Sequence, residues 1–126
     1  MASVTSDRVD GLTTDVTMKA ACRLASTADL TLSAAQTIDS VSAVAEDRVL
    51  VKDQNTDTEN GIYIVKSGAW VRARDFNGPR DFVQGTLVLV NYGTTHALGL
   101  FRVSSTADPH VVDTSSIAFT LADTLT

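Results

Sequence analysis

The chain has 126 residues, a length that fits one domain with a single modest core. Its 10 Lys and Arg residues are outnumbered by 15 Asp and Glu, which leaves a net charge of −5. A surface that binds nucleic acid or an anionic membrane needs clustered basic residues, so this balance argues against both partners.

Cys22 is the only cysteine, which excludes an internal disulfide and a cysteine-rich metal site. We expect it to be a small buried hydrophobic residue and not a reactive thiol. The N-terminal sequence lacks the basic and apolar regions of a signal peptide. No run of about 18 apolar residues is present that could cross a membrane. These features are consistent with folding in a reducing cytoplasm.

Residues 1–18 are polar and rich in Thr, Ser and Asp, without a sustained helical or alternating pattern. They predict an extended N-terminal arm that is either frayed or ordered only against a neighbouring subunit. A β-domain is expected over residues 19–126. Its first part contains short strand-like or turn-like segments: Lys19–Leu24, Leu30–Leu32, the turn Ala34–Gln36, Thr37–Asp39, and Val41–Ala45, which fits a strand or a loop.

The stretch from Asp47 to Asp75 has the clearest strand pattern. It holds three β-branched or aromatic runs, Val49–Val51, Ile62–Val65 and Trp70–Val71, and thus predicts a three-stranded antiparallel meander. A polar loop that ends in Asn-Gly joins the first two runs. The Lys66–Ala69 segment joins the next two, and it is short enough for a hairpin turn with its glycine at a positive φ.

The remaining segments complete a β-rich pattern. A turn-rich loop follows the meander, and Phe76 and Phe82 flank it and are expected to hold it against the core. The apolar run Gly85–Tyr92 predicts a central strand buried on both faces. Leu98–Val103 and Ile117–Leu121 predict two more strands. The pattern favours an all-β fold, a single small antiparallel β-sandwich or barrel of about eight short strands, and leaves these two open.

The polar loop from Asp53 to Glu59 begins like a calcium-binding loop because oxygen-bearing side chains alternate along it. However, Thr58 stands where such a loop needs Gly, and Ile64 stands where it needs a bidentate Glu. No flanking helix is predicted either. We expect these side chains to bond their own backbone in turns, with no metal or cofactor bound.

Catalytic patterns are weak. His96 and His110 are the only histidines, both in predicted loops, and no G-x-S-x-G or similar signature accompanies them. Asp108 beside Pro109 fits turn chemistry. A pair of carboxylates for glycoside hydrolysis could be chosen only arbitrarily. The chain is therefore not expected to be an enzyme.

Surface contacts are the remaining candidates. Arg72 and Arg74 alternate with apolar residues, so we expect them to project from one face of a strand, exposed to solvent or paired with an acid of a neighbouring subunit. With Asp7 and Arg8 of the arm, they are the candidate contacts within a larger assembly. Trp70 could belong to a stacking platform for sugars, but we expect it in the core, since aromatic residues make up only 6% of the chain.

Three segments resemble a known family. The string DRVLVKDQ, followed by ENGIY and GAWVRA, resembles a small β-domain that recurs in bacteriophage tail-fibre and tailspike proteins. Upstream, Ala28–Ser33 and Gln36–Asp39 resemble the family's ANITLSG and QTIDG segments. Downstream, Gly85–Val90 and Gly93–Thr95 resemble its GTLVFV and GTT segments. The chain departs from the family at Ser40 and Glu46, where the family has Gly, and at Phe101, where a Trp is common.

The resemblance implies a non-enzymatic structural virion protein of a tailed bacteriophage, assembled into the virion from the host cytoplasm. It would serve host attachment or fibre docking as a homo-oligomer, a trimer as in fibres of this kind. Its partners would be other phage structural proteins and host-surface glycan, without nucleic acid or membrane insertion. A capsid decoration or head-fibre protein is the first alternative, and a free-standing chain that begins at its own Met suits it. A small carbohydrate-binding or hydrolytic domain is the second.

Overall fold

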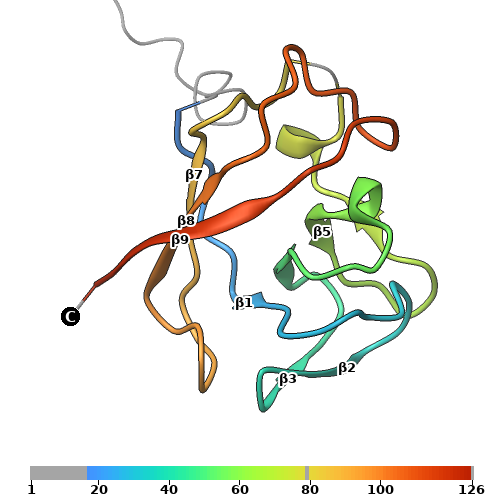
Figure 1. Cartoon of the computed structure of the whole chain (residues 1–126). Coiled ribbons are helices and arrows are strands. Elements are labelled where there is room, and N and C mark those ends of the chain that lie inside the picture. The colour runs from blue at the N-terminus through green and yellow to red at the C-terminus, as the bar shows by residue number, and fades with distance from the viewer. Residues whose placement is uncertain (1–16, 79, 126) are drawn as a thin grey trace, which may run out of the picture.

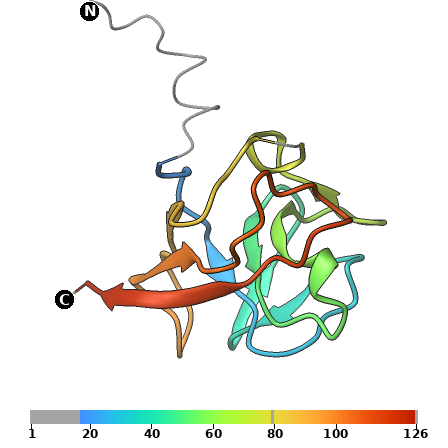
Figure 2. The same cartoon turned by 45° about the horizontal axis from the view of Figure 1, so that its top comes forward.

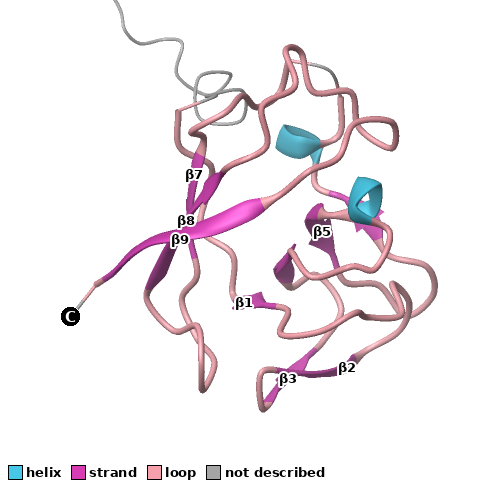
Figure 3. Ribbon diagram, viewed as in Figure 1, coloured by secondary structure: helices cyan, strands magenta, loops and turns pink. Residues whose placement is uncertain are grey.

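The computed structural model describes residues 17–78 and 80–125, and these form an all-β fold of short strands. The predicted fold class is therefore confirmed. Within these ranges no helix is long and apolar enough to cross a membrane. The elements are β1 (Leu24–Ala25), β2 (Gln36–Ile38), β3 (Val41–Ala43), β4 (Arg48–Val51), η1 (Asp57–Glu59), β5 (Gly61–Ile64), β6 (Val71–Arg72), η2 (Arg74–Phe76), β7 (Leu87–Leu89), β8 (Gly99–Val103) and β9 (Phe119–Thr124), where η1 and η2 are 3-10 helices (Figures 1 and 3).

The central meander is present as predicted. β4, β5 and β6 pair antiparallel, with Val49 opposite Tyr63 and Tyr63 opposite Arg72. β1 adds to the other side of β4 in parallel, which gives the sheet order β1-β4-β5-β6. The prediction that the glycine between β5 and β6 adopts a positive φ is wrong, because Gly68 does not have one.

Two further sheets complete the described part of the fold. β7, β8 and β9 form an antiparallel sheet in that order, and β2 and β3 form a separate hairpin. The hairpin turn is Asp39-Ser40, with φ of 50° and 69°. Positive φ at both central residues is the geometry of a type I′ turn, whose twist matches that of paired strands.

The segment from Met18 to Ala25 joins the two larger sheets. On one side it forms parallel bridges to the β7 region, and the Cys22 N–H donates to the Leu89 carbonyl at 2.8 Å. On the other side its β1 part pairs with β4. The two sheets are thereby connected into one bent sheet that runs from β9 through this segment to β6. No sheet among the described strands closes into a barrel.

Buried side chains form two clusters on opposite faces of β4 and β5. The first cluster lies between the two larger sheets and comprises Cys22, Ala25, Leu50, Ile62, Ala73, Phe76, Phe82, Val88, Val90, Phe101, Val103 and Ile117. The second lies under the β2–β3 hairpin and comprises Leu24, Ile38, Ala43, Val49, Val51, Tyr63, Val65 and Trp70. Successive residues of a strand point to opposite faces, so β4 and β5 contribute to both clusters.

This arrangement corrects two expectations. Gly85–Tyr92 was expected to hold the strand buried on both faces, but in β7 only Val88 is buried, while Leu87 and Leu89 are half-buried. β4 has that role instead. Leu30–Leu32 forms no strand, because the Gln54 side chain accepts the Leu30 N–H at 2.8 Å and takes the place of a partner strand. By contrast, Phe76 and Phe82 hold their loop against the core as expected, with stacked rings 3.8 Å apart.

Candidate functional site

Arg48 and Asp75, which lie near the two ends of the central segment, form a buried ion pair. The Arg48 guanidinium donates to both carboxylate oxygens of Asp75, at 2.9 and 2.8 Å, and the side chains are only 18% and 7% exposed. Arg48 also donates to the Ala20 carbonyl. Burial raises the pKa of the nearby Cys22 thiol to about 12, against the opposing charge of Arg48, so Cys22 is an inert buried thiol as expected.

Two buried amides hold the polar loop between β4 and β5. The Gln54 side chain donates to the Leu30 carbonyl at 3.0 Å and accepts the Leu30 N–H. Asn60 accepts the Gln54 N–H and donates to the Ile117 carbonyl at 2.8 Å. In the described part of the chain, no group of three or more His, Cys, Asp or Glu side chains is arranged to hold a metal ion. The side-chain amides of the loop thus bond the backbone of distant segments, and not only the backbone of their own turn as expected.

Arg72 is engaged within its own chain. Its guanidinium donates to the Thr58 and Asn60 carbonyls at 3.0 and 2.9 Å and pairs with Asp113 at 2.9 Å. It also lies 4.9 Å from the centre of the Tyr63 ring, and its side chain is only 10% exposed. The solvent exposure expected by default does not hold for this residue.

The other proposed contact residues lie apart from Arg72. β6 ends at Arg72, and Arg74 begins the 3-10 helix η2, so the two do not share a strand as expected. Arg74 is exposed to solvent. Asp7 and Arg8 lie outside the described residues. Of the predicted contact residues, the two that the structure describes therefore do not share a strand face.

A carboxylate clamp joins two of the segments that carry the family resemblance. Asp39, in the β2–β3 turn, accepts the backbone N–H groups of Thr95 and His96 at 2.9 to 3.0 Å. Its own carbonyl accepts the Thr94 N–H at 3.1 Å. Burial by itself would raise the pKa of Asp39, but the bonds from His96 and Thr95 outweigh it and lower this pKa below its ordinary value. The clamp fixes the β2–β3 hairpin to the loop after β7.

Two residues that stand where the resembling sequences have glycine adopt a positive φ. Ser40 and Glu46 have φ of 69° and 76°, in the left-handed region that glycine enters without strain. The Glu46 side chain pairs with Lys66 at 2.7 Å on the surface. The loop before Asp47 therefore keeps the conformation that glycine favours, although glycine is absent there.

His110 forms a buried pair with Ser105. The Ser105 hydroxyl lies 2.9 Å from His110 Nε2 and accepts the Ala118 N–H, and the imidazole packs 4.9 Å from the Phe82 ring. Burial lowers the pKa of His110, against smaller raising effects of the Ser105 backbone and Asp108. The imidazole is fully buried and its Nδ1 has no partner, so no acid orients it as in a catalytic triad.

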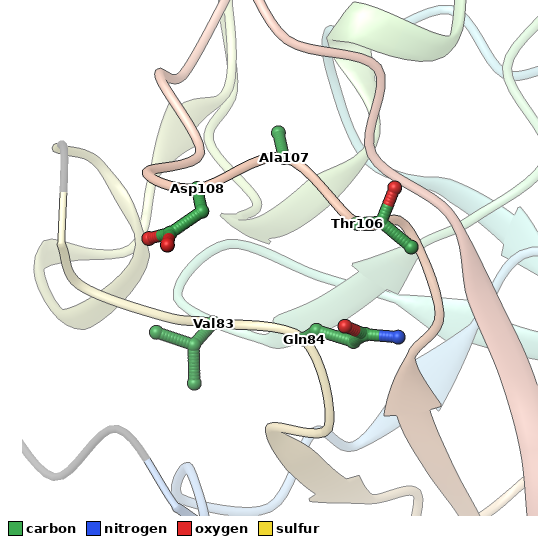
Figure 4. A pocket seen from close by; sticks show the side chains of 5 residues that line it. All are labelled: Val83, Gln84, Thr106, Ala107 and Asp108. Atoms are coloured by element: carbon green, nitrogen blue, oxygen red, sulfur yellow. The ribbon is translucent and has the colours of Figure 1, made fainter.

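A pocket of about 390 Å³ lies between two loops (Figure 4). It is lined by Val83, Gln84, Thr106, Ala107 and Asp108. His110 and Ser105 are not among the lining residues. Its polar lining consists of the Asp108 carboxylate, the Gln84 amide and the Thr106 hydroxyl (Figure 4).

Aromatic side chains do not form a sugar-binding platform around Trp70. Trp70 is 6% exposed, packs near Tyr63, and donates its indole N–H to the Ala34 carbonyl at 2.9 Å. Its expected core position is confirmed. Among the described residues Tyr92 is the strongly exposed aromatic, at 58%, and the Arg23 guanidinium lies 5.9 Å from its ring centre.

Comparison with protein-family models, curated proteins and solved structures finds no match to this chain. Its functional assignment therefore depends on the residues and their geometry. Sequence reasoning missed the clamp at Asp39 and the bracing amides Gln54 and Asn60, because their partners lie up to 57 residues away. The one sequence signal for them was their place inside the resembling segments.

Proposed function

We propose that the chain is a non-enzymatic structural virion protein of a tailed bacteriophage, a tail-fibre or tailspike-type module that serves host attachment or fibre docking. It acts as a homo-oligomer, a trimer as in fibres of this kind, in contact with other phage structural proteins. It works by holding loops and strand surfaces in fixed positions, without a cofactor.

One structural observation supports the proposal in addition to the similarity of the amino-acid strings. The segments that resemble the family lie far apart in the sequence, yet their polar residues bond directly to one another. Asp39 of the QTID segment clamps the GTT segment, and Gln54 of the DRVLVKDQ string bonds the backbone of Leu30 in the upstream segment. The resembling residues are thus those that a shared fold would require.

The backbone supports the same reading at the positions where the chain departs from the family. Ser40 and Glu46 adopt positive φ, the conformation for which the family's glycines are suited. If the similarity came by chance from strand-forming residues, the positions where the family has glycine would not be expected to have left-handed backbone in this chain. This agreement links the resemblance to a shared turn geometry.

Localisation on intact particles tests the proposal. Cryo-electron microscopy of the phage that encodes the chain, with copy number from mass analysis, is expected to find it at the tail in threes or sixes. Hundreds of copies on the head lattice would assign it to capsid decoration, the first alternative. Absence of the chain from purified particles would overturn the virion role in both forms.

Glycan binding, the second alternative, now depends on Tyr92 and not on Trp70. Tyr92 presents an exposed ring beside Arg23, the combination that stacks on a sugar and bonds its hydroxyls. In a glycan array, loss of binding by Tyr92→Ala with retention by Val83→Ala would favour this alternative. Equal binding by the two variants, or none by the native protein, would remove it.

A further inference from the structure

The chain contains two Asn-Gly pairs, Asn60-Gly61 and Asn77-Gly78. In such a pair the backbone nitrogen of the glycine can attack the side-chain carbonyl carbon of the asparagine and close a five-membered ring. Glycine favours this reaction because it has no Cβ to hinder the approach and enters backbone conformations that other residues avoid. The two pairs have different surroundings in the fold, and these surroundings decide which asparagine reacts.

The first pair is fixed inside the protein. Asn60 is only 4% exposed. Its side-chain oxygen accepts the Gln54 N–H at 3.0 Å, and its side-chain nitrogen donates to the Ile117 carbonyl at 2.8 Å. A Cβ on Gly61 would stand 2.5 Å from the Arg72 guanidinium, so the glycine is closely packed as well. Ring closure at Asn60 would leave buried polar groups without partners, which opposes the reaction.

The second pair lies in the turn that follows η2. In both views this part of the chain runs along the outside of the protein (Figures 1 and 2). Asn77 is exposed, and its side-chain amide has no hydrogen-bond partner among the described residues. A Cβ on Gly78 would approach only the Asp81 side chain, at 3.7 Å. The Asn77 side chain can therefore turn toward the Gly78 nitrogen without breaking a bond of its own.

One carboxylate restrains the backbone of this second pair. Asp81 Oδ2 accepts the N–H groups of Asn77 and Gly78, each at 2.9 Å. Asn77 has ψ of 4°, so the Gly78 nitrogen is nearly eclipsed with the Asn77 nitrogen. Ring closure needs the Gly78 nitrogen eclipsed with Cβ of Asn77 instead, and intramolecular attack is fast only when the reacting atoms are so placed. The turn must therefore release Asp81 before it reacts.

We propose that Asn77 is a site of spontaneous deamidation whose rate Asp81 restrains, while the fold protects Asn60. The Gly78 nitrogen loses its proton to solvent and bonds to Cγ of Asn77, and the side-chain nitrogen leaves as ammonia. Water then opens the cyclic imide at either carbonyl carbon, which gives aspartate or isoaspartate at position 77. The net reaction consumes one water and releases one ammonia, without another reactant.

The product places a new carboxylate beside Asp81. The reaction adds one negative charge to a chain whose net charge is already −5, and like charges on one turn repel each other. The isoaspartate product also lengthens the main chain by one atom. Both changes loosen the turn between Phe76 and Phe82, whose stacked rings are buried in the core. This chemistry does not depend on the virion role, which particle localisation tests separately.

Peptide mapping by mass spectrometry tests the proposal on the full-length protein. During incubation at slightly alkaline pH, peptides that contain Asn77 should gain about one dalton at least tenfold faster than peptides that contain Asn60. In guanidinium chloride the two sites should react at rates within about threefold, because the unfolded chain protects neither. No reaction at Asn77, or equal rates in the folded protein, would overturn the site. A difference that persists in denaturant would overturn protection by the fold.

Two variants test the chemistry and the restraint. Gly78→Ala adds a Cβ beside the attacking nitrogen and should slow the reaction at Asn77 at least tenfold. Asp81→Ala should accelerate it at least threefold. Asp29→Ala is the matched control, since Asp29 accepts the Asn55 N–H in another exposed turn, and it should leave the rate at Asn77 unchanged.

The rate at Asn60 in the same samples reports whether a variant has unfolded. Acceleration at Asn77 alone in Asp81→Ala would support the restraint. Equal acceleration at Asn60, an unchanged or slower rate at Asn77, or the same acceleration in Asp29→Ala would overturn it. An undiminished rate in Gly78→Ala would overturn the attack by the Gly78 nitrogen.

Discussion

Gly93 and Asp39 touch so closely that a Cβ on Gly93 would stand 2.3 Å from Oδ2 of the Asp39 carboxylate. Gly93 also has φ of 123°, a conformation that residues with a side chain rarely adopt. The clamp between the β2–β3 turn and the loop after β7 therefore requires both residues together. One supplies the acceptor, and the other leaves room for it.

We expect Gly93→Ala and Asp39→Ala each to lower the free energy of unfolding by about 1–3 kcal/mol, through strain in the first and lost hydrogen bonds in the second. The double variant should lose less than the sum, because the methyl group no longer meets a carboxylate. Urea denaturation of the three variants measures this coupling. Strict additivity would show that the two residues act independently.

The Arg48–Asp75 pair should be worth far more than the surface pair of Lys66 and Glu46. Arg48→Met leaves the Asp75 carboxylate buried without a partner and should cost about 3–5 kcal/mol in the free energy of unfolding. Lys66→Met is the control and should cost less than about 1 kcal/mol, since Glu46 is 71% exposed. Chemical denaturation at neutral pH compares them, and similar costs would contradict the prediction.

Glu46→Gly should stabilise the protein by about 0.5–1 kcal/mol, because it relieves a left-handed backbone at φ 76°. Glu46→Ala is the matched control: it removes the same ion pair with Lys66 but keeps a Cβ, so it should not stabilise. The difference in melting temperature between these two variants isolates the backbone effect. A more stable alanine variant would refute the strain argument.

The His110 pair predicts a loss of stability in mild acid. Burial lowers the pKa of His110 in the folded protein, so the unfolded chain, with a pKa near 6.5, binds the proton more readily. The contribution of neutral His110 to stability is therefore complete above about pH 6.5 and declines as pH falls toward the folded pKa. Burial lowers the pKa of His96 as well, so His96 adds to the same trend.

His110→Gln keeps a polar group near the Ser105 hydroxyl but cannot take up a proton in this range. Its free energy of unfolding should therefore vary less between pH 7.5 and 5.0 than that of the native protein. Denaturant titrations at several pH values give the comparison. An identical pH dependence in the two proteins would exclude His110 as a source of the acid sensitivity.

Local pattern was sufficient for most of the strands and for the identity of much of the core, although the expected strand at Leu30–Leu32 is absent. The alternation of β-branched and aromatic residues predicted the meander from Asp47 to Asp75 and the strands near Leu98 and Ile117. Such alternation is visible in the sequence because successive side chains of a strand point to opposite faces. The core positions of Cys22, Trp70 and the stacked phenylalanines followed from residue type alone.

Only the tertiary structure decided where the polar side chains act. The roles of Arg72 and Asp39 depend on partners that the fold brings from 41 and 57 residues away, and no local pattern encodes such pairs. The same holds for β4, which is buried on both faces because the β7–β9 sheet covers one face and the β2–β3 hairpin covers the other. Sequence determined which segments extend and which side chains avoid water, while the packing of those segments determined which distant polar groups meet, since such contacts are a property of the whole fold.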